Sequence, residues 1–218
     1  MTMRASDERV LTVASAELEQ GIQKLGLSIA ADEQALLLQY LVLLEKWNQV
    51  YNLTAIRDLA KMVSAHLLDS LAVVPFLQGH TVLDAGSGAG LPGIPIALAE
   101  PGLEVTLLDS SHKRTAFLRQ AVADLGLRNA TVVCERVESW QSPRQFDVIV
   151  SRAFADLGEF VSLTQRLLAP GGVFLAMKGI FPYEEIEHLP PGYRVREVKP
   201  LQVPGLNAER HLVLVERA

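Results

Sequence analysis

Residues 81–96 read TVLDAGSGAGLPGIPI, and the other elements of the chain can be placed relative to this stretch. Apolar residues open it as a buried strand, and a carboxylate follows at Asp84. Glycines at Gly86, Gly88 and Gly90 then lead into a helix. Glycine lets a backbone turn sharply and lie close to a ligand, because a Cβ atom would collide there. Since a helix start also offers unpaired N–H groups, the stretch predicts a small-molecule site at the carboxyl end of a strand.

The spacing of the glycines distinguishes two classes of nucleotide site. A dinucleotide site reads Gly-x-Gly-x-x-Gly, with an acidic residue about 20 positions further on. This chain instead reads Gly-x-Gly-x-Gly with Asp84 two residues before the first glycine, a pattern typical of S-adenosylmethionine (AdoMet) sites. Asp109 ends the next apolar strand, where a carboxylate can accept both ribose hydroxyls. A loop that only joins strand to helix is the alternative, and the two carboxylates together disfavour it.

Composition limits the possible classes of protein. A chain of 218 residues that is 49% hydrophobic is enough for one domain with an extension. The net charge of −5 means that any contact with RNA must use a local basic patch. A single cysteine excludes an internal disulfide or a zinc–cysteine cluster, and we expect no metal. We also expect no signal peptide, no apolar run near the roughly 18 residues of a membrane span, and a cytoplasmic protein.

The chain divides into a helical part and an alternating part. Helices are predicted at residues 6–24, 31–50 and 58–71, with Asp58 as the N-cap of the third. Residues 1–78 are therefore predicted to be an N-terminal helical extension, and residues 79–218 a methyltransferase domain. We expect the extension to cover the cofactor.

From residue 81 onward, apolar strands alternate with helices, as in right-handed βαβ units on a parallel sheet. Two final strands flank nine residues that contain Pro204 and Gly205, so they can pair antiparallel. We therefore predict a Rossmann-like class I AdoMet-dependent methyltransferase fold: a mostly parallel seven-stranded sheet with a C-terminal antiparallel hairpin. The predicted strands are 81–84, 104–108, 130–134, 146–150, 172–177, 193–201 and 211–216, and the predicted helices are 92–99, 112–125 and 156–168.

Six separated motifs resemble one bacterial family. They are LEKWNQVYNLTAIRD (44–58), HLLDS (66–70), LDAGSGAGLPGIP (83–95), LLDSSHKRTAFLRQ (107–120), FDVIVSRAFA (146–155) and LQVPGLNAERHLV (201–213). In this order they resemble the RsmG family, also called glucose-inhibited division protein B. The resemblance implies AdoMet-dependent methylation of N7 of the guanosine at position 527 of 16S ribosomal RNA, in the small ribosomal subunit.

The residues are compatible with this chemistry. Guanine N7 has a free in-plane lone pair and no proton to remove, so no general base is expected. Catalysis would then come mostly from proximity and orientation. The chain also lacks the Asn/Asp-Pro-Pro-aromatic motif of enzymes that methylate exocyclic amines, and Ser151 and Arg152 stand in its place.

The resemblance implies cofactor contacts in the first loop and after the third and fourth strands. Glu138 suits the adenine amino group, and Asp109 suits the ribose. For Glu138 the alternative is a helix cap or a solvated charge, and for Arg152 it is a surface salt bridge. The predicted cofactor-binding residues are Asp84, Gly86, Gly88, Leu91, Asp109, Val137, Glu138 and Arg152.

The substrate side follows from the resemblance alone. Asn52 could contact a base edge or could be a turn residue. His66 lies on an apolar helix, where a lone histidine is more often a core or interface residue. Lys178 could contact a phosphate or could be a solvated charge. The predicted substrate-positioning residues are Asn52, His66, Arg136, Arg152 and Lys178.

Other functions stay open at this point. A non-catalytic AdoMet-sensing RNA-binding module would keep the same cofactor residues. A nicotinamide-dependent oxidoreductase is disfavoured by the glycine spacing and by the terminal hairpin. We expect a monomer, with 16S ribosomal RNA or the small subunit as partner.

Overall fold

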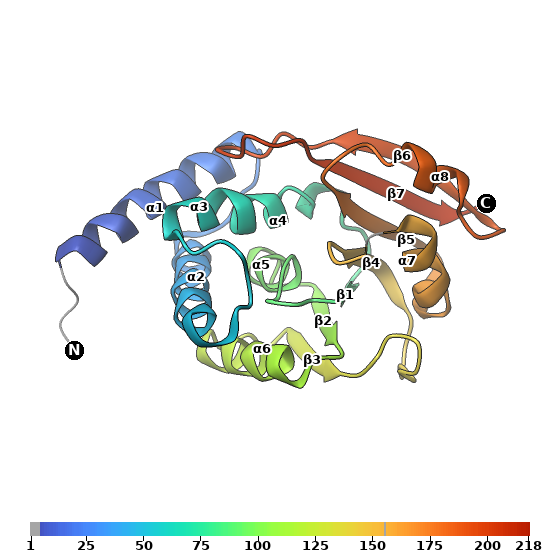
Figure 1. Cartoon of the computed structure of the whole chain (residues 1–218), viewed down its shortest axis with the longest axis horizontal. Coiled ribbons are helices and arrows are strands. Elements are labelled where there is room, and N and C mark those ends of the chain that lie inside the picture. Colours follow the sequence, from blue (N-terminus) through green and yellow to red (C-terminus); the bar gives the residue numbers. More distant parts are fainter. Residues whose placement is uncertain (1–4, 155) are drawn as a thin grey trace.

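The computed structural model describes residues 5–154 and 156–218, with side chains from residue 10 onward. In this described part, seven strands form one sheet in the order β3-β2-β1-β4-β5-β7-β6 (Figure 1). The strands are β1 (Thr81–Ala85), β2 (Glu104–Asp109), β3 (Ala130–Cys134), β4 (Phe146–Ser151), β5 (Leu168–Lys178), β6 (Tyr193–Pro200) and β7 (His211–Arg217). The pairs among β1 to β5 are parallel, and β7 runs antiparallel to both β5 and β6. The predicted fold class is confirmed.

Helices precede the sheet and cover both of its faces. The extension contains α1 (Ala5–Lys24), α2 (Ala31–Tyr51), α3 (Leu59–Met62), the π-helix η1 (Val63–Leu68), α4 (Asp69–Leu71) and the 3₁₀ turn η2 (Val74–Phe76). After β1 follow α5 (Gly93–Ala99), α6 (His112–Asp124), α7 (Leu157–Thr164), the 3₁₀ turn η3 (Gln165–Leu167) and α8 (Tyr183–Glu187). Asp58 caps α3 as predicted, because its side chain accepts a hydrogen bond from the N–H of Ala60.

Successive strand residues face opposite layers of the core. Val148 and Val150 pack with α5, α6 and the extension, whereas Ile149 packs with α7. Figure 1 shows the same division, with α2, α5 and α6 on one side of the sheet and α7 and α8 on the other. Because one core joins the extension to the sheet, the predicted boundary at residue 79 stays a prediction.

Two predicted helices differ from the structure. The helix at 58–71 is divided by the π-helix η1, and the helix at 156–168 ends at Thr164 before a 3₁₀ turn. Strand β5 begins at Leu168, opposite Phe146, and its pairing then jumps to Val173 opposite Val148. The strand predicted at 172–177 therefore begins earlier than expected, because the irregular segment 168–172 also belongs to β5. The five-residue helix α8 was missed, because so short a segment has too little periodicity to detect.

One expectation about hydropathy was wrong. The 18-residue stretch Leu59–Phe76 has a mean hydropathy of 1.3 and is long and apolar enough to match a membrane span by these criteria. It is, however, 78% buried inside the structure. Its apolar side chains pack against α1 and α5, so the stretch belongs to the hydrophobic core.

Candidate active site

The loop of residues 86–90 joins β1 to the segment that leads into α5. Gly86, Gly88 and Gly90 have φ values of 74°, 58° and 90°, in the left-handed region that favours glycine. The N–H groups of Gly86 and Ser87 both donate to the carbonyl of Leu108, at 2.8 and 3.0 Å. A Cβ atom on Gly86 would lie 2.9 Å from the Cβ of Ala153. The loop is thus tied to the end of β2 and passes close to the segment after β4.

Asp84, in β1, holds the start of α5, the helix that follows this loop. Its side chain is fully buried, and Oδ2 accepts a hydrogen bond of 2.9 Å from the N–H of Gly93. Oδ1 is buried without a partner in the described residues. Burial raises the pKa of Asp84 to about 7. Asp84 lines none of the cavities described below, so a direct contact with a cofactor stays a prediction.

Asp109, at the end of β2, faces the loop from the neighbouring strand. Its Oδ2 accepts from the N–H of Gly88 at 2.9 Å, and its Oδ1 accepts from the N–H of Ser111 at 2.8 Å. The guanidinium of Arg114 lies 3.4 Å from Oδ2, and its side chain is half exposed. Two backbone N–H groups therefore fix the orientation of this carboxylate. Oδ1 keeps lone-pair capacity for a further donor, whereas Oδ2 already accepts from Gly88 and Arg114.

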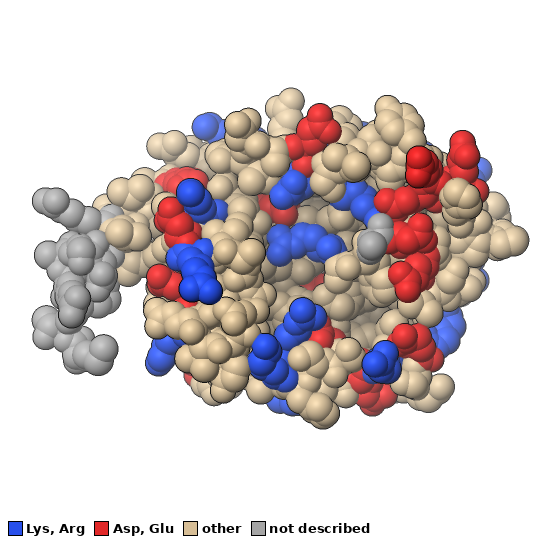
Figure 2. Space-filling model, viewed as in Figure 1, with Lys and Arg blue, Asp and Glu red and all other residues tan. Residues whose placement is uncertain are grey.

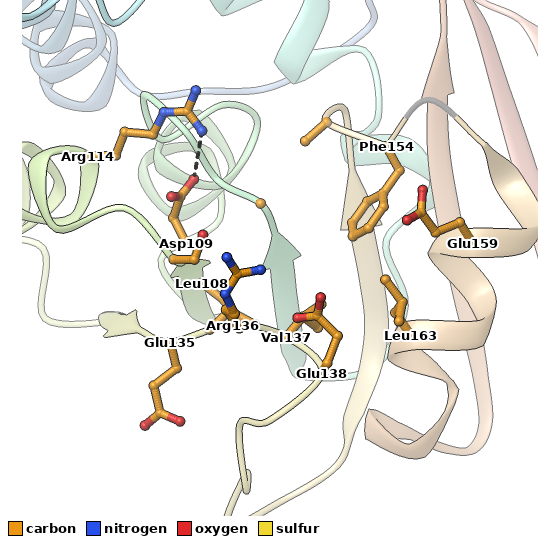
Figure 3. Close-up of a pocket in the computed structure, with 13 residues that line it drawn as sticks. Leu108, Asp109, Arg114, Glu135, Arg136, Val137, Glu138, Phe154, Glu159 and Leu163 are labelled. Atoms are coloured by element: carbon orange, nitrogen blue, oxygen red, sulfur yellow. Dashed lines mark hydrogen bonds and ion pairs between the residues drawn. The ribbon is translucent and has the colours of Figure 1, made fainter.

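In the described part of the chain, three neighbouring cavities follow the carboxyl ends of the parallel strands. The first has a volume of about 230 Å³. Figure 3 shows Asp109 on one side of it and Phe154 on the other, with Arg136 and Glu138 pointing into the space and Glu135 pointing away. Of the predicted cofactor residues, this cavity brings together Gly86, Asp109, Val137 and Glu138.

The second cavity, of about 310 Å³, adjoins the first, because Gly86, Arg114 and Ala153 line both. Its walls are the glycine loop on one side and residues of the extension, Leu53 and Thr54, on the other. The predicted residues that line it are Gly86, Gly88, Leu91 and Arg152.

The third cavity, of about 390 Å³, shares Thr54 and Arg152 with the second. A buried ion-pair network lies at its wall. Asp69 is fully buried, and it accepts from Arg152 Nη1 at 3.1 Å and from Arg210 Nε at 2.9 Å. Arg152 also donates to the carbonyl of Ala65 at 3.3 Å. Both guanidinium groups are thereby held at the cavity by one carboxylate.

His66 and Lys178 also line the third cavity. His66 is buried, and its Nε2 lies 2.9 Å from Thr54 Oγ1. Burial lowers the pKa of His66 to about 4, so the ring is neutral near pH 7. Lys178 is 10% exposed, and its Nζ lies 2.6 Å from Glu185 Oε2, which also accepts from the N–H of Leu157. Neither side chain is a freely solvated charge.

The other two predicted substrate residues lie apart from this group. Arg136 is exposed and lines the first cavity. Asn52 lines none of the three cavities. It ends α2 in the left-handed region, with φ 49°, and its Oδ1 accepts from Arg57 at 3.3 Å. The structure thus gives Asn52 the turn position that was the alternative to a base contact.

Asp69 and Arg210 were not predicted as site residues. The sequence held one signal for Asp69, since a carboxylate within an apolar helix needs a cationic partner. Nothing in the periodicity identified that partner. Cys134 and the other His, Asp and Glu residues of the described part form no group of three that could hold a metal ion.

The surface charge is not evenly spread. Figure 2 shows Lys and Arg side chains gathered around a central hollow, with acidic side chains beside it over α7 and α8. A protein of net charge −5 therefore presents a local basic area at the edge where the cavities open.

Comparisons with known proteins agree on one family. Residues 33–213 match the family model GidB, described as rRNA small subunit methyltransferase G. Two relatives named Ribosomal RNA small subunit methyltransferase G are similar over nearly their whole length. The one from Laribacter hongkongensis is 57% identical over 90% of this chain and 95% of its own. The one from Chromobacterium violaceum is 58% identical over 93% of this chain and 98% of its own.

Solved structures support the fold alone. The glycopeptide N-methyltransferase MtfA complexed with S-adenosyl-L-homocysteine aligns with a TM-score of 0.61 at 14% identity, covering 70% of this chain and 87% of that one. TrmN from Thermus thermophilus aligns with a TM-score of 0.54 at 22% identity, covering 68% of this chain and 47% of that one. At such identities the shared feature is the sheet with its helices.

Proposed function

This chain belongs to the rRNA small subunit methyltransferase G family, and from that membership we propose that it methylates N7 of the guanosine at position 527 of 16S ribosomal RNA. It is a methyltransferase with AdoMet as methyl donor. The atom and the nucleotide are the proposed part. We also propose that it acts as a cytoplasmic monomer on the small subunit or its RNA.

The first and second cavities suit AdoMet. Asp109 and Glu138 offer carboxylates to the ribose and to the adenine amino group in the first cavity. The second cavity offers close approach to the glycine loop, which a Cβ on Gly86 would obstruct. The two cavities adjoin at Gly86, Arg114 and Ala153, so one extended ligand can reach from the first to the second. We therefore place the adenosine part in the first cavity and the amino acid part in the second.

The third cavity is the proposed place of the guanine. The observation that carries this assignment is the shared boundary: Thr54 and Arg152 line both the second and the third cavity. A donor group held in the second cavity can therefore face a base held in the third. Arg152 stands at that boundary with its guanidinium fixed by Asp69, so it is the residue we expect to position donor and base relative to each other.

The reaction requires side chains chiefly to position the two reactants. AdoMet supplies an activated methyl group, which the N7 lone pair takes in an in-line displacement that leaves S-adenosylhomocysteine. N7 carries no proton, and the neutral ring of His66 is bonded to Thr54 and is not needed as a base. The chain contributes chiefly alignment, an effect that can be worth several kcal/mol.

The RNA backbone is expected to follow the basic area around the cavities. Arg136 is exposed and accessible to a phosphate. Lys178 is paired with Glu185, so a phosphate could bind it only by replacing or sharing that carboxylate. The two residues are therefore expected to contribute differently to RNA binding.

The direct test is methyl transfer from radiolabelled AdoMet to 16S RNA and to small subunits that lack 7-methylguanosine. Label in 7-methylguanosine at position 527 would support the proposal, and the preferred form would identify the substrate. Label in another nucleotide would contradict it. If AdoMet binds but no ribosomal RNA form is methylated, a non-catalytic AdoMet-sensing RNA-binding module becomes the better explanation.

A further inference from the structure

Tyr40 joins the extension to the glycine loop. It lies on α2, its side chain is fully buried, and its hydroxyl donates to the carbonyl of Ala89 at 2.6 Å. The two residues are 49 positions apart. Among the described residues, this is the one hydrogen bond between the extension and residues 86–91. A phenylalanine would fill the same apolar space without the hydroxyl. The hydrogen bond to Ala89 is therefore the feature that distinguishes a tyrosine at this position.

The rest of the loop is held from the sheet side. Asp109 accepts from Gly88, and the N–H groups of Gly86 and Ser87 donate to the end of β2. The Ala89 carbonyl points the other way, and Ala89 is itself buried. The peptide group that carries the Ala89 carbonyl is anchored at its other end, because the N–H of Gly90 donates to the carbonyl of Ser87 at 2.7 Å. The Tyr40 hydroxyl is the partner of the carbonyl end, so it completes the hydrogen bonding of this peptide group.

The position of this hydroxyl is well determined. The Tyr40 ring packs against Phe117 of α6, with ring centroids 6.3 Å apart, and Phe117 is fully buried. Trp47 packs against the same Phe117 at 5.6 Å. Burial raises the pKa of the Tyr40 hydroxyl far above its usual range, so it remains a donor at any working pH. The aromatic packing of α2 on α6 therefore fixes a donor at the cofactor loop.

We propose that Tyr40 is a positioning residue for AdoMet: by holding the Ala89 carbonyl, it keeps the glycine loop in the shape that lines the second cavity. The same helix α2 leads into Leu53 and Thr54, which form the opposite wall of that cavity. The extension thus forms one wall of the second cavity and holds the glycine loop, which is the other wall. The inference rests on the proposed function only in placing AdoMet in the second cavity.

The test is Tyr40→Phe, which removes the hydroxyl and keeps the ring. Tyr193→Phe is the matched control, because Tyr193 packs on Phe174 and its hydroxyl has no partner in the described residues. We expect Tyr40→Phe to weaken AdoMet binding about tenfold in calorimetry, since a buried carbonyl is left unpaired. At saturating AdoMet, kcat should stay within about twofold and the KM for RNA should not change, because uniform cofactor binding is what is lost.

A purely structural role predicts something else. If Tyr40→Phe lowers the Tm while its AdoMet Kd stays within twofold of the Tyr193→Phe value, the inference is wrong. It is also wrong if the KM for RNA rises in place of the AdoMet Kd. Should Tyr40→Phe not fold, Phe117→Leu keeps the hydroxyl but loosens its support, and an unchanged AdoMet Kd in that variant would overturn the inference.

Calorimetry separates this inference from the proposed function. The titration needs no RNA. If wild-type protein binds AdoMet but does not methylate position 527, the substrate proposal is contradicted, and the AdoMet Kd of Tyr40→Phe still tests the role of Tyr40. Wild-type methylation of that position combined with an unaltered AdoMet Kd in Tyr40→Phe would do the reverse.

Discussion

The glycine loop and the third cavity lie at the same edge of one sheet but are held together differently. Backbone N–H groups fix the loop, and they donate to the carbonyl of Leu108 and to the carboxylate of Asp109 on the adjoining strand β2. Side-chain charges fix the third cavity, where Asp69 holds Arg152 and Arg210 from distant parts of the chain. The first arrangement depends on backbone conformation and the second on charge pairing. Different substitutions should therefore damage each.

The largest expected effect is on the loop. Gly86→Ala would impose a φ of 74° on alanine, at roughly 1–2 kcal/mol, and would place its Cβ 2.9 Å from that of Ala153. We expect AdoMet affinity, measured by calorimetry, to fall by about 100-fold. The added methyl group would both distort the glycine loop and fill space beside it.

Gly171→Ala is the control for backbone strain. Gly171 has a φ of 78°, and a Cβ atom there would meet nothing within 4 Å. This variant should lose a similar amount of stability but retain its AdoMet affinity. Equal losses of affinity in the two variants would show that strain anywhere in the fold impairs the site, and the distinct role of the loop would fail.

The second effect is on the third cavity. Asp69→Asn keeps the shape of the side chain but leaves two guanidinium groups without their charge partner. We expect a loss of about 3 kcal/mol in the free energy of unfolding, measured with urea. The KM for RNA should rise more than the AdoMet Kd, because Arg210 lines only the third cavity.

Glu216→Gln offers a matched comparison at the surface. Glu216 also pairs with two arginines, Arg194 at 2.7 Å and Arg196 at 3.9 Å, but those arginines are 65% and 45% exposed. Water screens such pairs, so this change should cost no more than about 1 kcal/mol. If Asp69→Asn costs as little, the buried network does not hold the cavity together.

The third effect is on pH dependence, and the two regions should show opposite signs. Asp84 has a folded pKa of about 7 against an ordinary 3.8, so between those values the folded state keeps a proton that the unfolded state has lost. Stability from Asp84 therefore falls as pH rises through this window. His66 has a folded pKa of about 4 against 6.5, so its contribution rises with pH. Each slope is at most about 1.4 kcal/mol per pH unit.

Urea titrations between pH 4.5 and 6.5 can isolate the two contributions. Asp84→Asn should increase the slope of stability against pH relative to wild type, because the falling contribution of Asp84 is lost. His66→Gln should decrease that slope, because the rising contribution of His66 is lost. The difference between each variant and wild type cancels the other titrating groups. Two variants with the same change of slope, or with none, would mean that these side chains are not buried as described.

The smallest effect is on RNA contact. Arg136→Ala should raise the KM for RNA several-fold and reduce the slope of log affinity against log salt by about 1, as the loss of one phosphate contact does. Arg128→Ala, an exposed arginine beyond α6, is the control and should change neither. A similar change in both variants would mean that only overall charge matters.

The fold was largely predictable because its signals are local. Alternating apolar strands and helices give a parallel sheet, and the nearness of Asp109 to the glycine loop follows because the carboxyl ends of adjacent strands meet at one edge. The irregular start of β5 was not predictable. There the pairing with β4 jumps between Leu168 and Val173, and only the partner strand determines that register.

The third cavity was predictable only in part. His66, Arg152 and Lys178 entered through the family resemblance. The ion-pair network did not, because its partners lie 83 and 141 positions apart and no periodicity connects them. Tyr40 was hidden for a related reason. Its spacing on α2 indicates a core residue, and only the packed structure places its hydroxyl at Ala89.

The assignment of the cofactor to the first two cavities and of the base to the third is tested most directly by a crystal structure with S-adenosylhomocysteine bound. The account predicts adenosine in the first cavity, within hydrogen-bond distance of Asp109, and the homocysteine part in the second cavity against residues 86–91. It also predicts that the third cavity, with Asp69 bridging Arg152 and Arg210, stays free for the base. Density for the ligand in the third cavity, or an adenosine remote from Asp109, would contradict it.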